Sequence, residues 1–557
     1  MRFLPLLFLI FFTLNAALPD EESLKKEIGH MLIVGFEGAL VDANSSIVQD
    51  IQSYELGGVI LFDRLYRDKT QSKNITSPQQ LQTLTKTLKS YAKKPLLISI
   101  DQEGGKVARL KPAYGFTQVP SAKRVAELPE EEARAIYKTQ AKMLKENGIN
   151  CDFAPIVDLA VEPKNTVIVG LERSYGDGAA VNKYAAIFMQ ELARQNIISV
   201  LKHFPGHGSS LGDSHAGFVD VSASWSVQEL APYKHFIQTN EVDMIMSAHV
   251  FNSHLDANYP ATLSYNTNTK LLREELGYRG VLVSDDMQMG AIAKHYSLDE
   301  RVVLAINSGV DMLLFGNQIE AHEPQKIIQT IYESVLSGKI PYARIQEANA
   351  RIANLHTKNT IIQKPVNFSQ KRIDLSKEYI QTHYGFEAKN IDIQPKSIVL
   401  HWTSIMDFEL CFERLKAEEI VQGRKYIQNA GALNVSAHFL VDRDGTIYQL
   451  MPENLMARHT IGLNYSAIGI ENIGGEENKA EDLTQEQAEA NIRLIRYLKQ
   501  KYPAIEYLLG HYEYLKMQNT PLWLEKDADY RTAKVDPGLR FMVKVRENIA
   551  DLGLKTP

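Results

Sequence analysis

Short apolar runs alternate with amphipathic stretches through the first 320 residues of the chain. The stretches between the runs, such as 129–148 and 179–196, carry apolar residues at helical spacing. Near-continuous apolar strands that alternate with helices indicate a parallel sheet covered on both faces. Eight such runs favour an α/β fold built as a closed (β/α)8 TIM-type barrel over an open sheet. The predicted strands are 31–36, 57–62, 95–101, 151–157, 197–204, 242–250, 280–286 and 310–316.

A second pattern starts at Ser397, after a stretch with few strong apolar periods. It reads as a strand, a helix, a strand pair joined by an Asp-Gly turn, another strand and an amphipathic helix at 484–502. This order predicts a smaller mixed α/β domain, and the stretch before it reads as a linker with a helix around 376–383. The predicted organisation is a signal segment at 1–18, a barrel domain at 19–358, a linker at 359–394 and a second domain at 395–557.

The first residues have the layout of a secretory signal. Arg2 is followed by an apolar run from Phe3 to about Leu14, and the small residues Ala16 and Ala17 come next. The run is shorter than the ~20 residues that span a bilayer, and no later run reaches that length. We therefore expect an exported protein, periplasmic or extracellular, without stable membrane insertion. An uncleaved membrane anchor is the alternative.

Composition and charge exclude several classes of protein. Hydrophobic residues make up 44% and charged residues 23% of the chain, as in ordinary globular proteins. The net charge of −6 gives no basic excess, so we expect no nucleic-acid partner. Cys151 and Cys411 form no CxxC pair, which excludes a disulfide framework and a thiolate zinc cluster. The sequence makes no prediction about oligomeric state.

Polar side chains stand where the predicted barrel strands end. Buried polar groups are costly unless they are paired, and barrel enzymes place their chemistry at the C-terminal strand ends. A Gly/Pro-rich loop after the fifth strand adds Asp213 and His215. A strand-end Asp suits the nucleophile of glycoside hydrolysis, and a loop imidazole held by a carboxylate suits the proton donor. The strand-end residues are Asp101, Lys202, His203, His249, Asp285 and Asp286.

Three motifs carry a family resemblance over about residues 22–355. DQEGGKVAR (101–109), KHFPGHGSSLGDSH (202–215) and VSDDMQM (283–289) resemble family 3 glycoside hydrolases, specifically bacterial β-N-acetylglucosaminidases of the cell-wall recycling type. The resemblance implies a retaining mechanism through a covalent glycosyl-enzyme, with Asp285 as nucleophile and His215, held by Asp213, as acid/base. Asp286 is interpreted as a structural or supporting carboxylate. The residues implied in sugar binding are Asp101, Arg109, Arg173, Lys202 and His203.

The second domain offers scattered candidates for a metal site. His401 ends a predicted strand, His511 follows YLLG, and Asp536 precedes Pro-Gly. None lies at the short spacing of an HExxH site, so spacing alone is weak evidence. Zinc accepts two His and one Asp and leaves a fourth position for water. Glu471, inside an apolar strand, would then be a general base, and Lys534 would stabilise a developing oxyanion.

These residues resemble the zinc-dependent N-acetylmuramoyl-L-alanine amidases of the phage-lysozyme-like type, over about 395–550. The resemblance implies that His401, His511 and Asp536 bind Zn²⁺ and that Glu471 and Lys534 are catalytic. The 25 positions from His511 to Asp536 exceed the family's usual spacing. We therefore keep two other candidates for the third ligand, and we also interpret two further histidines, one as structural and one on the substrate side. The two other candidates are Asp527 and Asp529, the structural histidine is His438, and the substrate-side histidine is His459.

Both resemblances point to one substrate. The first family removes N-acetylglucosamine (GlcNAc) from N-acetylmuramic acid (MurNAc), and the second cuts the amide between MurNAc and L-Ala. The sequence therefore predicts a bifunctional hydrolase whose partners are peptidoglycan fragments (muropeptides). One alternative is a chitin-oligosaccharide β-N-acetylhexosaminidase whose C-terminal domain only binds cell wall. Another is a cell-wall-binding protein without catalysis.

Overall fold

The computed structural model describes residues 18–213, 217–239, 241–420 and 425–557. Residues 1–17 of the predicted signal and His215 of the predicted acid/base pair lie outside the described residues. The chain divides into two compact units, Met1–Ile352 and Ala353–Pro557. Within the described ranges, every helix is too short or too polar to cross a bilayer.

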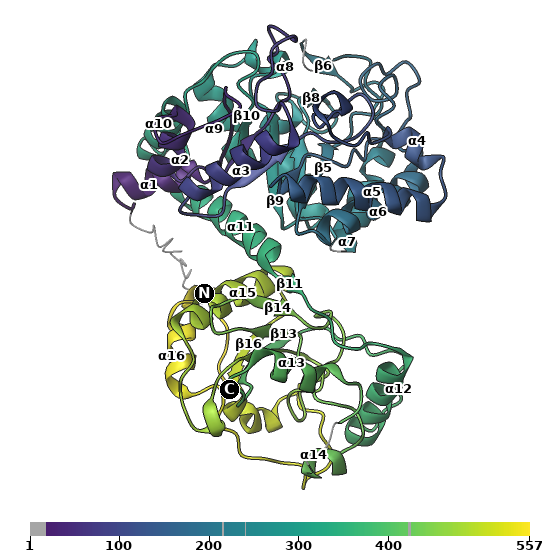
Figure 1. Ribbon diagram of the computed structural model, residues 1–557, viewed down its shortest axis with the longest axis vertical. Coiled ribbons are helices and arrows are strands. Elements are labelled where there is room, and N and C mark those ends of the chain that lie inside the picture. Colours follow the sequence, from purple (N-terminus) through teal and green to yellow (C-terminus); the bar gives the residue numbers. More distant parts are fainter. Residues whose placement is uncertain (1–17, 214–216, 240, 421–424) are drawn as a thin grey trace, which may run out of the picture. The chain divides into compact units, whose positions relative to one another are not determined.

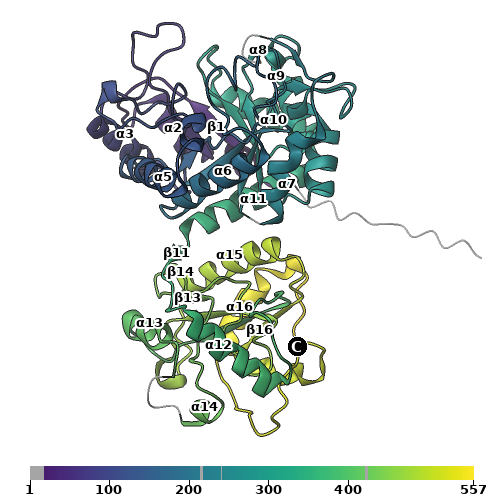
Figure 2. The same ribbon diagram turned by 90° about the vertical axis from the view of Figure 1, so that its right-hand side faces the viewer.

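The first unit is a closed barrel of eight parallel strands, with helices around it (Figures 1 and 2). Each strand neighbours the next barrel strand along the chain, and the last pairs with the first. The prediction of an α/β chain with a TIM-type barrel is confirmed, and each predicted strand contains one of the eight. The barrel strands are β1 Leu32–Gly35, β2 Gly58–Ile60, β3 Leu97–Ile100, β4 Cys151–Asp152, β5 Ile198–Phe204, β7 Met244–Ser247, β9 Val281–Asp286 and β10 Met312–Phe315.

The helices of this unit begin and end at recognisable signals. Ser297 and Glu300 form a reciprocal capping box at the start of α9, and Gly309 ends that helix in the left-handed conformation at φ +111°. A two-stranded parallel ladder, β6 Val219–Asp220 with β8 Val250–Phe251, lies outside the barrel sheet. The α-helices are α1 Glu21–Gly29, α2 Ser46–Tyr54, α3 Pro78–Tyr91, α4 Ala122–Ala126, α5 Glu130–Glu146, α6 Gly178–Ala193, α7 Ala231–Gln238, α8 Gly290–Ala293, α9 Leu298–Ser308, α10 Pro324–Leu336 and α11 Tyr342–Thr360.

The second unit contains a six-stranded mixed sheet (Figure 1). The strand order is β11-β14-β13-β15-β12-β16, and only the pair β13 and β14 is antiparallel among the described strands. Its strands are β11 Ile362–Gln363, β12 Ser397–Trp402, β13 Phe439–Val441, β14 Ile447–Gln449, β15 Ala467–Asn472 and β16 Tyr507–Gly510. Its further α-helices are α12 Gln370–Tyr379, α13 Phe408–Lys416, α14 Lys425–Asn429, α15 Gln485–Lys501 and α16 Leu539–Glu547.

The two faces of this sheet serve different purposes. Ile398 and Leu400 of β12 belong to the core cluster formed with helices α15 and α16. Because side chains alternate along a strand, Val399 and His401 point to the opposite face. Val399 packs there with Tyr514, in a separate cluster. The alternation therefore places His401 on the face that does not carry α15 and α16.

The stretch between the predicted domains is folded. After α11 it forms β11, α12 and a further helical turn, Ile380–Tyr384, where the sequence predicted a helix at 376–383 within a linker. Tyr379, Ile380 and Tyr384 are buried in one cluster with Leu433 and Met456. Residues 361–393 therefore contribute to the core of the second unit.

Candidate active sites

A network of five charged side chains lies at the C-terminal end of barrel strands β3 and β5. Lys202 Nζ is 3.0 Å from Asp101 Oδ1 and 2.7 Å from Glu103 Oε1. Arg109 Nη2 donates to Asp101 Oδ2 at 3.0 Å. Arg173 donates to both oxygens of Glu103 in a bidentate pair, each bond 2.8 Å long. Each carboxylate therefore contacts two cations.

This pairing keeps the buried acids ionised. Burial alone would raise the pKa of Asp101, but the charges of Lys202 and Arg109 hold that pKa well below its usual range. Burial likewise opposes ionisation of Glu103, yet Arg173 and Lys202 lower its pKa to about 2. The network thus presents fixed charges and N–H donors at the barrel mouth, which suit the hydroxyl and amide groups of a sugar.

His203 is held by a carboxylate that the sequence analysis missed. Its Nδ1 lies 2.7 Å from Asp158 Oδ2, and the backbone N–H of His207 donates to Asp158 Oδ1 at 2.8 Å. Burial, followed by the charge of His203, lowers the pKa of His207 to about 4. Asp158 sits in the apolar run PIVDLA, and a buried acid there was the available signal. Glu103, also missed, stands within the DQEGG motif.

The two carboxylates at the end of β9 have different surroundings. Asp286 Oδ1 accepts from the backbone N–H groups of Gln288 at 3.0 Å and Gly316 at 3.2 Å. Those bonds agree with the structural interpretation of Asp286. Asp285 is half-buried and accepts the Asp286 N–H at 2.7 Å, while His249 Nε2 lies 2.9 Å from the Asp286 carbonyl oxygen. Asp285 thus stands at the same strand-end side of the barrel as the charged network.

The acid/base pair predicted on the loop after β5 is only partly described. Asp213 is exposed, and His215 lies outside the described residues. The assignment of His215 as acid/base therefore stays a prediction.

Strand register brings two of the second unit's candidates together. β12 and β15 are parallel, and His401 pairs directly with Glu471, so both side chains leave the sheet on the same face. His511 comes immediately after β16, the other neighbour of β12. Asp536 is fixed beside it, because the Tyr512 N–H donates to the Asp536 carbonyl oxygen at 3.0 Å. Residues up to 135 positions apart therefore meet at one sheet end, His401 and Asp536 being the extremes.

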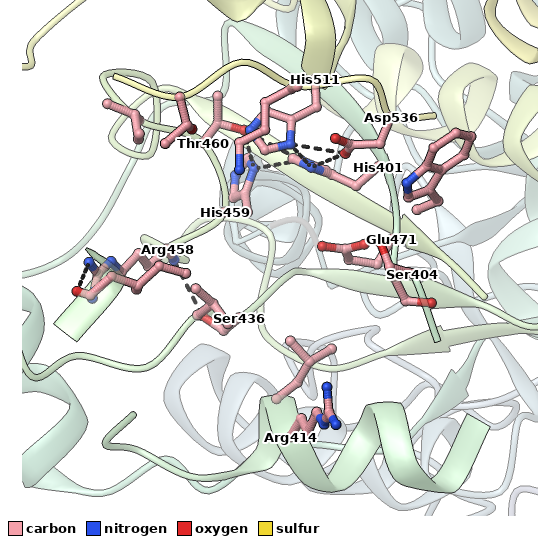
Figure 3. A pocket seen from close by; sticks show the side chains of 18 of the residues that line it. His401, Ser404, Arg414, Ser436, Arg458, His459, Thr460, Glu471, His511 and Asp536 are labelled. Atoms are coloured by element: carbon pink, nitrogen blue, oxygen red, sulfur yellow. Dashed lines mark hydrogen bonds and ion pairs between the residues drawn. The ribbon is translucent and has the colours of Figure 1, made fainter. Parts of the chain in front are cut away.

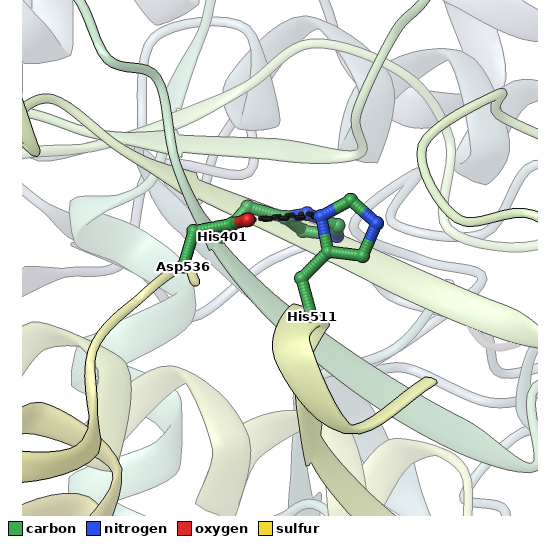
Figure 4. A group of neighbouring side chains, drawn as sticks. All are labelled: His401, His511 and Asp536. Atoms are coloured by element: carbon green, nitrogen blue, oxygen red, sulfur yellow. Dashed lines mark hydrogen bonds and ion pairs between the residues drawn. The ribbon is translucent and has the colours of Figure 1, made fainter. Parts of the chain in front are cut away.

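His401, His511 and Asp536 form a tight buried group (Figure 4). Asp536 Oδ2 lies 2.9 Å from His511 Nδ1 and 3.4 Å from His401 Nδ1, and the two Nδ1 atoms are 3.0 Å apart. One ligand atom from each residue lies within 4.8 Å of the others. Burial, followed by the charge of His511, lowers the pKa of His401 to about 4, so its imidazole is neutral.

This donor set fits a zinc ion. Neutral imidazoles and an ionised carboxylate are zinc ligands, and three protein ligands leave one position for water. The donor atoms that face one another are Nδ1 of His401, Nδ1 of His511 and Oδ2 of Asp536, and no two of them are more than 3.4 Å apart. Asp527 and Asp529, the two alternative ligands, are exposed and lie outside the group. The geometry favours Asp536 over both.

A pocket of about 780 Å³ opens over this group (Figure 3). Glu471 and Lys534 line it together with the three candidate ligands. His459, which also lines it, has its Nδ1 3.1 Å from His401 Nε2. His438 instead accepts the Gly469 N–H at Nδ1 and binds the Leu455 carbonyl oxygen through Nε2, at 2.9 and 2.8 Å. Those bonds agree with the structural interpretation of His438.

The long segment between His511 and Asp536 forms part of the pocket wall through Tyr530, Thr532, Ala533 and Lys534. Glu525 anchors it, since its Oε1 lies 3.0 Å from Nδ1 of His383, and both residues are buried. The Lys526 N–H also donates to the His383 carbonyl oxygen at 2.9 Å. No local sequence pattern marks this anchor, because His383 lies in the predicted linker.

Family comparisons agree with the two folds and their sites. Residues 23–355 match the family model of the glycosyl hydrolase family 3 N terminal domain, and residues 392–539 match that of N-acetylmuramoyl-L-alanine amidase. The barrel and its strand-end carboxylates thus define a glycoside hydrolase, and the chain belongs to glycosyl hydrolase family 3. Its second unit carries an amidase domain, so the protein is an enzyme of two hydrolase families.

Named relatives support the same assignment. A beta-hexosaminidase of Nitrosomonas eutropha is 32% identical over 326 residues, which cover 57% of this chain and 89% of that protein. Beta-hexosaminidase A of Pseudoalteromonas piscicida is 31% identical over 55% of this chain, and the match spans 54% of its own length. A solved family 3 beta-N-acetylglucosaminidase from Paenibacillus sp. is 25% identical with a TM-score of 0.55, covering 87% of this chain and 84% of that one.

Proposed function

We propose that the protein is a bifunctional hydrolase of peptidoglycan fragments. The barrel unit would remove GlcNAc from GlcNAc–MurNAc muropeptides, and the second unit would cleave the MurNAc–L-Ala amide. The buried group of His401, His511 and Asp536 beside Glu471 carries this proposal, because it stands in a chain whose other unit belongs to glycosyl hydrolase family 3 and has relatives named beta-hexosaminidase. A domain that only binds cell wall does not need such a buried ligand set.

In the barrel unit, Asp285 would attack the anomeric carbon and form a glycosyl-enzyme. His215, oriented by Asp213, would protonate the departing oxygen and later deprotonate the attacking water, as a retaining mechanism requires. Asp101, Arg109, Arg173, Lys202 and His203 would hold the sugar. The network around Lys202 supports this role, because its groups are fixed before any substrate arrives.

In the second unit, His401, His511 and Asp536 would hold Zn²⁺, which when bound polarises a carbonyl and lowers the pKa of a water. Glu471 would take a proton from the attacking water and pass it to the leaving amine. Lys534 would stabilise the negative charge that develops on the carbonyl oxygen. Both side chains line the same pocket as the ligand group.

We also propose that the enzyme acts outside the cytoplasm. The arrangement of Arg2, the apolar run to about Leu14 and the small residues Ala16 and Ala17 supports export. Fractionation of cells that produce the full chain tests this proposal. Retention of the protein in the cytoplasm would contradict it.

A purified GlcNAc–MurNAc–tripeptide, analysed by mass spectrometry after digestion, tests the glycosidase half. Asp285→Asn removes the nucleophile and should reduce GlcNAc release at least about 1000-fold while amide cleavage continues. Trapping with a slow fluorinated sugar should label Asp285 in the wild-type enzyme. Labelling at Asp286 instead would refute the assignment.

The amidase half is tested by zinc content measured together with the rate of amide cleavage. Asp536→Ala should lower zinc affinity more than about 100-fold and stop amide cleavage, because one of three ligands is lost. Asp527→Ala is the matched control and should keep both zinc and activity. A chelator should reproduce Asp536→Ala without affecting GlcNAc release. Full zinc occupancy in Asp536→Ala would refute the ligand set.

A further inference from the structure

The amidase pocket has a second polar feature, at a distance from the ligand group. Figure 3 shows Arg414, carried by α13, at the opposite end of the pocket from His511 and Asp536. Cys411 and Leu415 of the same helix also line the pocket, as do Asn434 and Val435. Among the described residues that line the pocket, the Lys and Arg side chains are Arg414, Arg458 and Lys534.

Arg414 is available to a ligand, whereas the pocket's other arginine is not. In the described part of the chain, the Arg414 guanidinium makes no hydrogen bond or ion pair. The backbone carbonyl oxygen of Arg414 accepts a hydrogen bond from Asn434 Nδ2 at 2.8 Å, and this bond fixes the backbone at this point of α13. Arg458 is buried and its guanidinium donates to four backbone carbonyl oxygens and to the Tyr530 hydroxyl. Arg458 therefore holds the wall, and Arg414 faces the pocket with open N–H donors.

The chemistry of the substrate limits which of its groups can bind Arg414. A guanidinium pairs best with a carboxylate or phosphate, through two parallel hydrogen bonds. Muramic acid has a single carboxyl group, on its lactyl arm, and that group is the acyl half of the amide to be cut. Any other carboxylate on such a substrate belongs to the peptide.

We propose that Arg414 binds a free carboxylate on the peptide side of the substrate and makes the second unit selective for acidic stem peptides. This inference rests on the proposed amidase function. The peptide would extend from the ligand group, along the pocket, towards α13. Arg414 would contribute to substrate binding and take no part in bond cleavage.

Two substrates that differ only in charge test the proposal: MurNAc–L-Ala–D-Glu with free carboxylates, and the same compound with both carboxylates converted to carboxamides. The wild-type enzyme should prefer the acid about tenfold in kcat/KM, chiefly through KM, because a charged hydrogen-bonded pair is lost with the amide. Arg414→Gln should remove the preference by lowering kcat/KM for the acid substrate only. Arg414→Lys should fall between, since a lysine cannot form the bidentate pair.

Lys416→Gln is the matched control, because Lys416 lies on the same helix, pairs with Glu413 at 3.0 Å and does not line the pocket. It should keep the wild-type preference, and the melting temperature should not change in any of the three variants. Equal wild-type rates on both substrates, or equal losses on both in Arg414→Gln, would overturn the Arg414 proposal alone. Cleavage of neither substrate by the wild-type enzyme would overturn the amidase function itself.

Discussion

Charged side chains buried in the barrel unit are stable where they meet opposite charges. Lys202 contacts both Asp101 and Glu103, and Arg173 makes two bonds to Glu103. Glu229 lacks such a partner: it is 1% exposed, and its Oε2 accepts the Gly208 N–H at 2.9 Å without a cation beside it among the described residues. Burial raises the pKa of Glu229 to about 7. This carboxyl lies under the loop that leads to Asp213, so its protonation concerns the site.

The raised pKa of Glu229 predicts that the free energy of unfolding depends on pH. Between pH ~4.5 and ~7 the folded protein keeps a proton that the unfolded chain releases, so stability falls as the pH rises through this window. Above pH 7 the free energy of unfolding is lower by on the order of 3 kcal/mol because of this carboxyl. Glu229→Gln removes it, so the variant should gain stability over the wild type at pH 8 but not at pH 4. Thermal unfolding of both proteins at the two pH values measures the difference.

An exposed acid provides the control for this prediction. Glu241→Gln should change the melting temperature equally at both pH values, since Glu241 is exposed. If the curves of Glu229→Gln and the wild type stay parallel from pH 4 to pH 8, the buried carboxyl does not titrate as described.

At the level of residues, the sequence reveals the candidate site residues that stand at the end of a regular strand. Asp101, Lys202, Asp285 and His401 could be predicted because a polar group after an apolar run interrupts a clear pattern. Their partners lie in irregular segments, where no periodicity marks them. Glu103 follows a strand in a Gly-rich turn, and only the fold shows that Arg173, 70 positions away, meets it.

Among the elements, the segment between His511 and Asp536 shows how an irregular stretch is fixed. The buried pair of Glu525 with His383 and the contact of the Tyr530 hydroxyl with Arg458 Nη2, at 3.1 Å, tie it to two other parts of the second unit. The ring of His383 also stacks on Tyr379, with centroids 4.2 Å apart. Lys534 and Asp536 follow directly, so their positions depend on this anchor.

His383→Ala should destabilise the second unit by about 3 kcal/mol, because it leaves the Glu525 carboxylate buried without its partner. Amide cleavage should fall about tenfold, since Lys534 and Asp536 lose their support, while GlcNAc release stays unchanged. The double variant His383→Ala/Glu525→Gln should recover part of the stability, which a double-mutant cycle measures. Additive effects of the two changes would show that the pair is not coupled. Lys555→Ala, in the exposed pair with Glu506, should leave the melting temperature unchanged.

The elements themselves could be predicted to different extents. Eight barrel strands were evident because each is mostly buried and lies in a largely apolar run. The segment 361–393 lacked such a pattern, because β11 has two residues and α12 contributes only scattered side chains to the core. Short elements that depend on contacts distant in sequence leave little local signal.

For the whole molecule, the extent of the second unit matters most. The amidase family match begins at residue 392, whereas the compact unit begins at Ala353. The intervening residues bury Tyr379, Ile380 and Tyr384 against Leu433 and Met456. Side chains of this size contribute about 1.5–3 kcal/mol each when buried, and together they approach the total stability of an ordinary domain.

Two fragments test this extent. A fragment from Ala353 to Pro557 should fold cooperatively and bind one zinc ion. A fragment from Asp392 should show broad thermal unfolding and poor zinc retention, because its Leu433 and Met456 would face solvent. Circular dichroism and metal analysis compare the two. Equal melting temperatures for both would show that residues 353–391 are dispensable.

The packing of α12 also bears on how such a chain can be inherited. Recombination that joins or separates the two catalytic units succeeds only where the cut spares both cores. A crossover at the start of the recognisable amidase homology would discard the buried tyrosines of α12 and its following turn, and with them His383, which anchors the wall of the pocket. The coding segment that must be inherited intact for amidase activity is therefore expected to begin upstream of residue 392, where the family match begins.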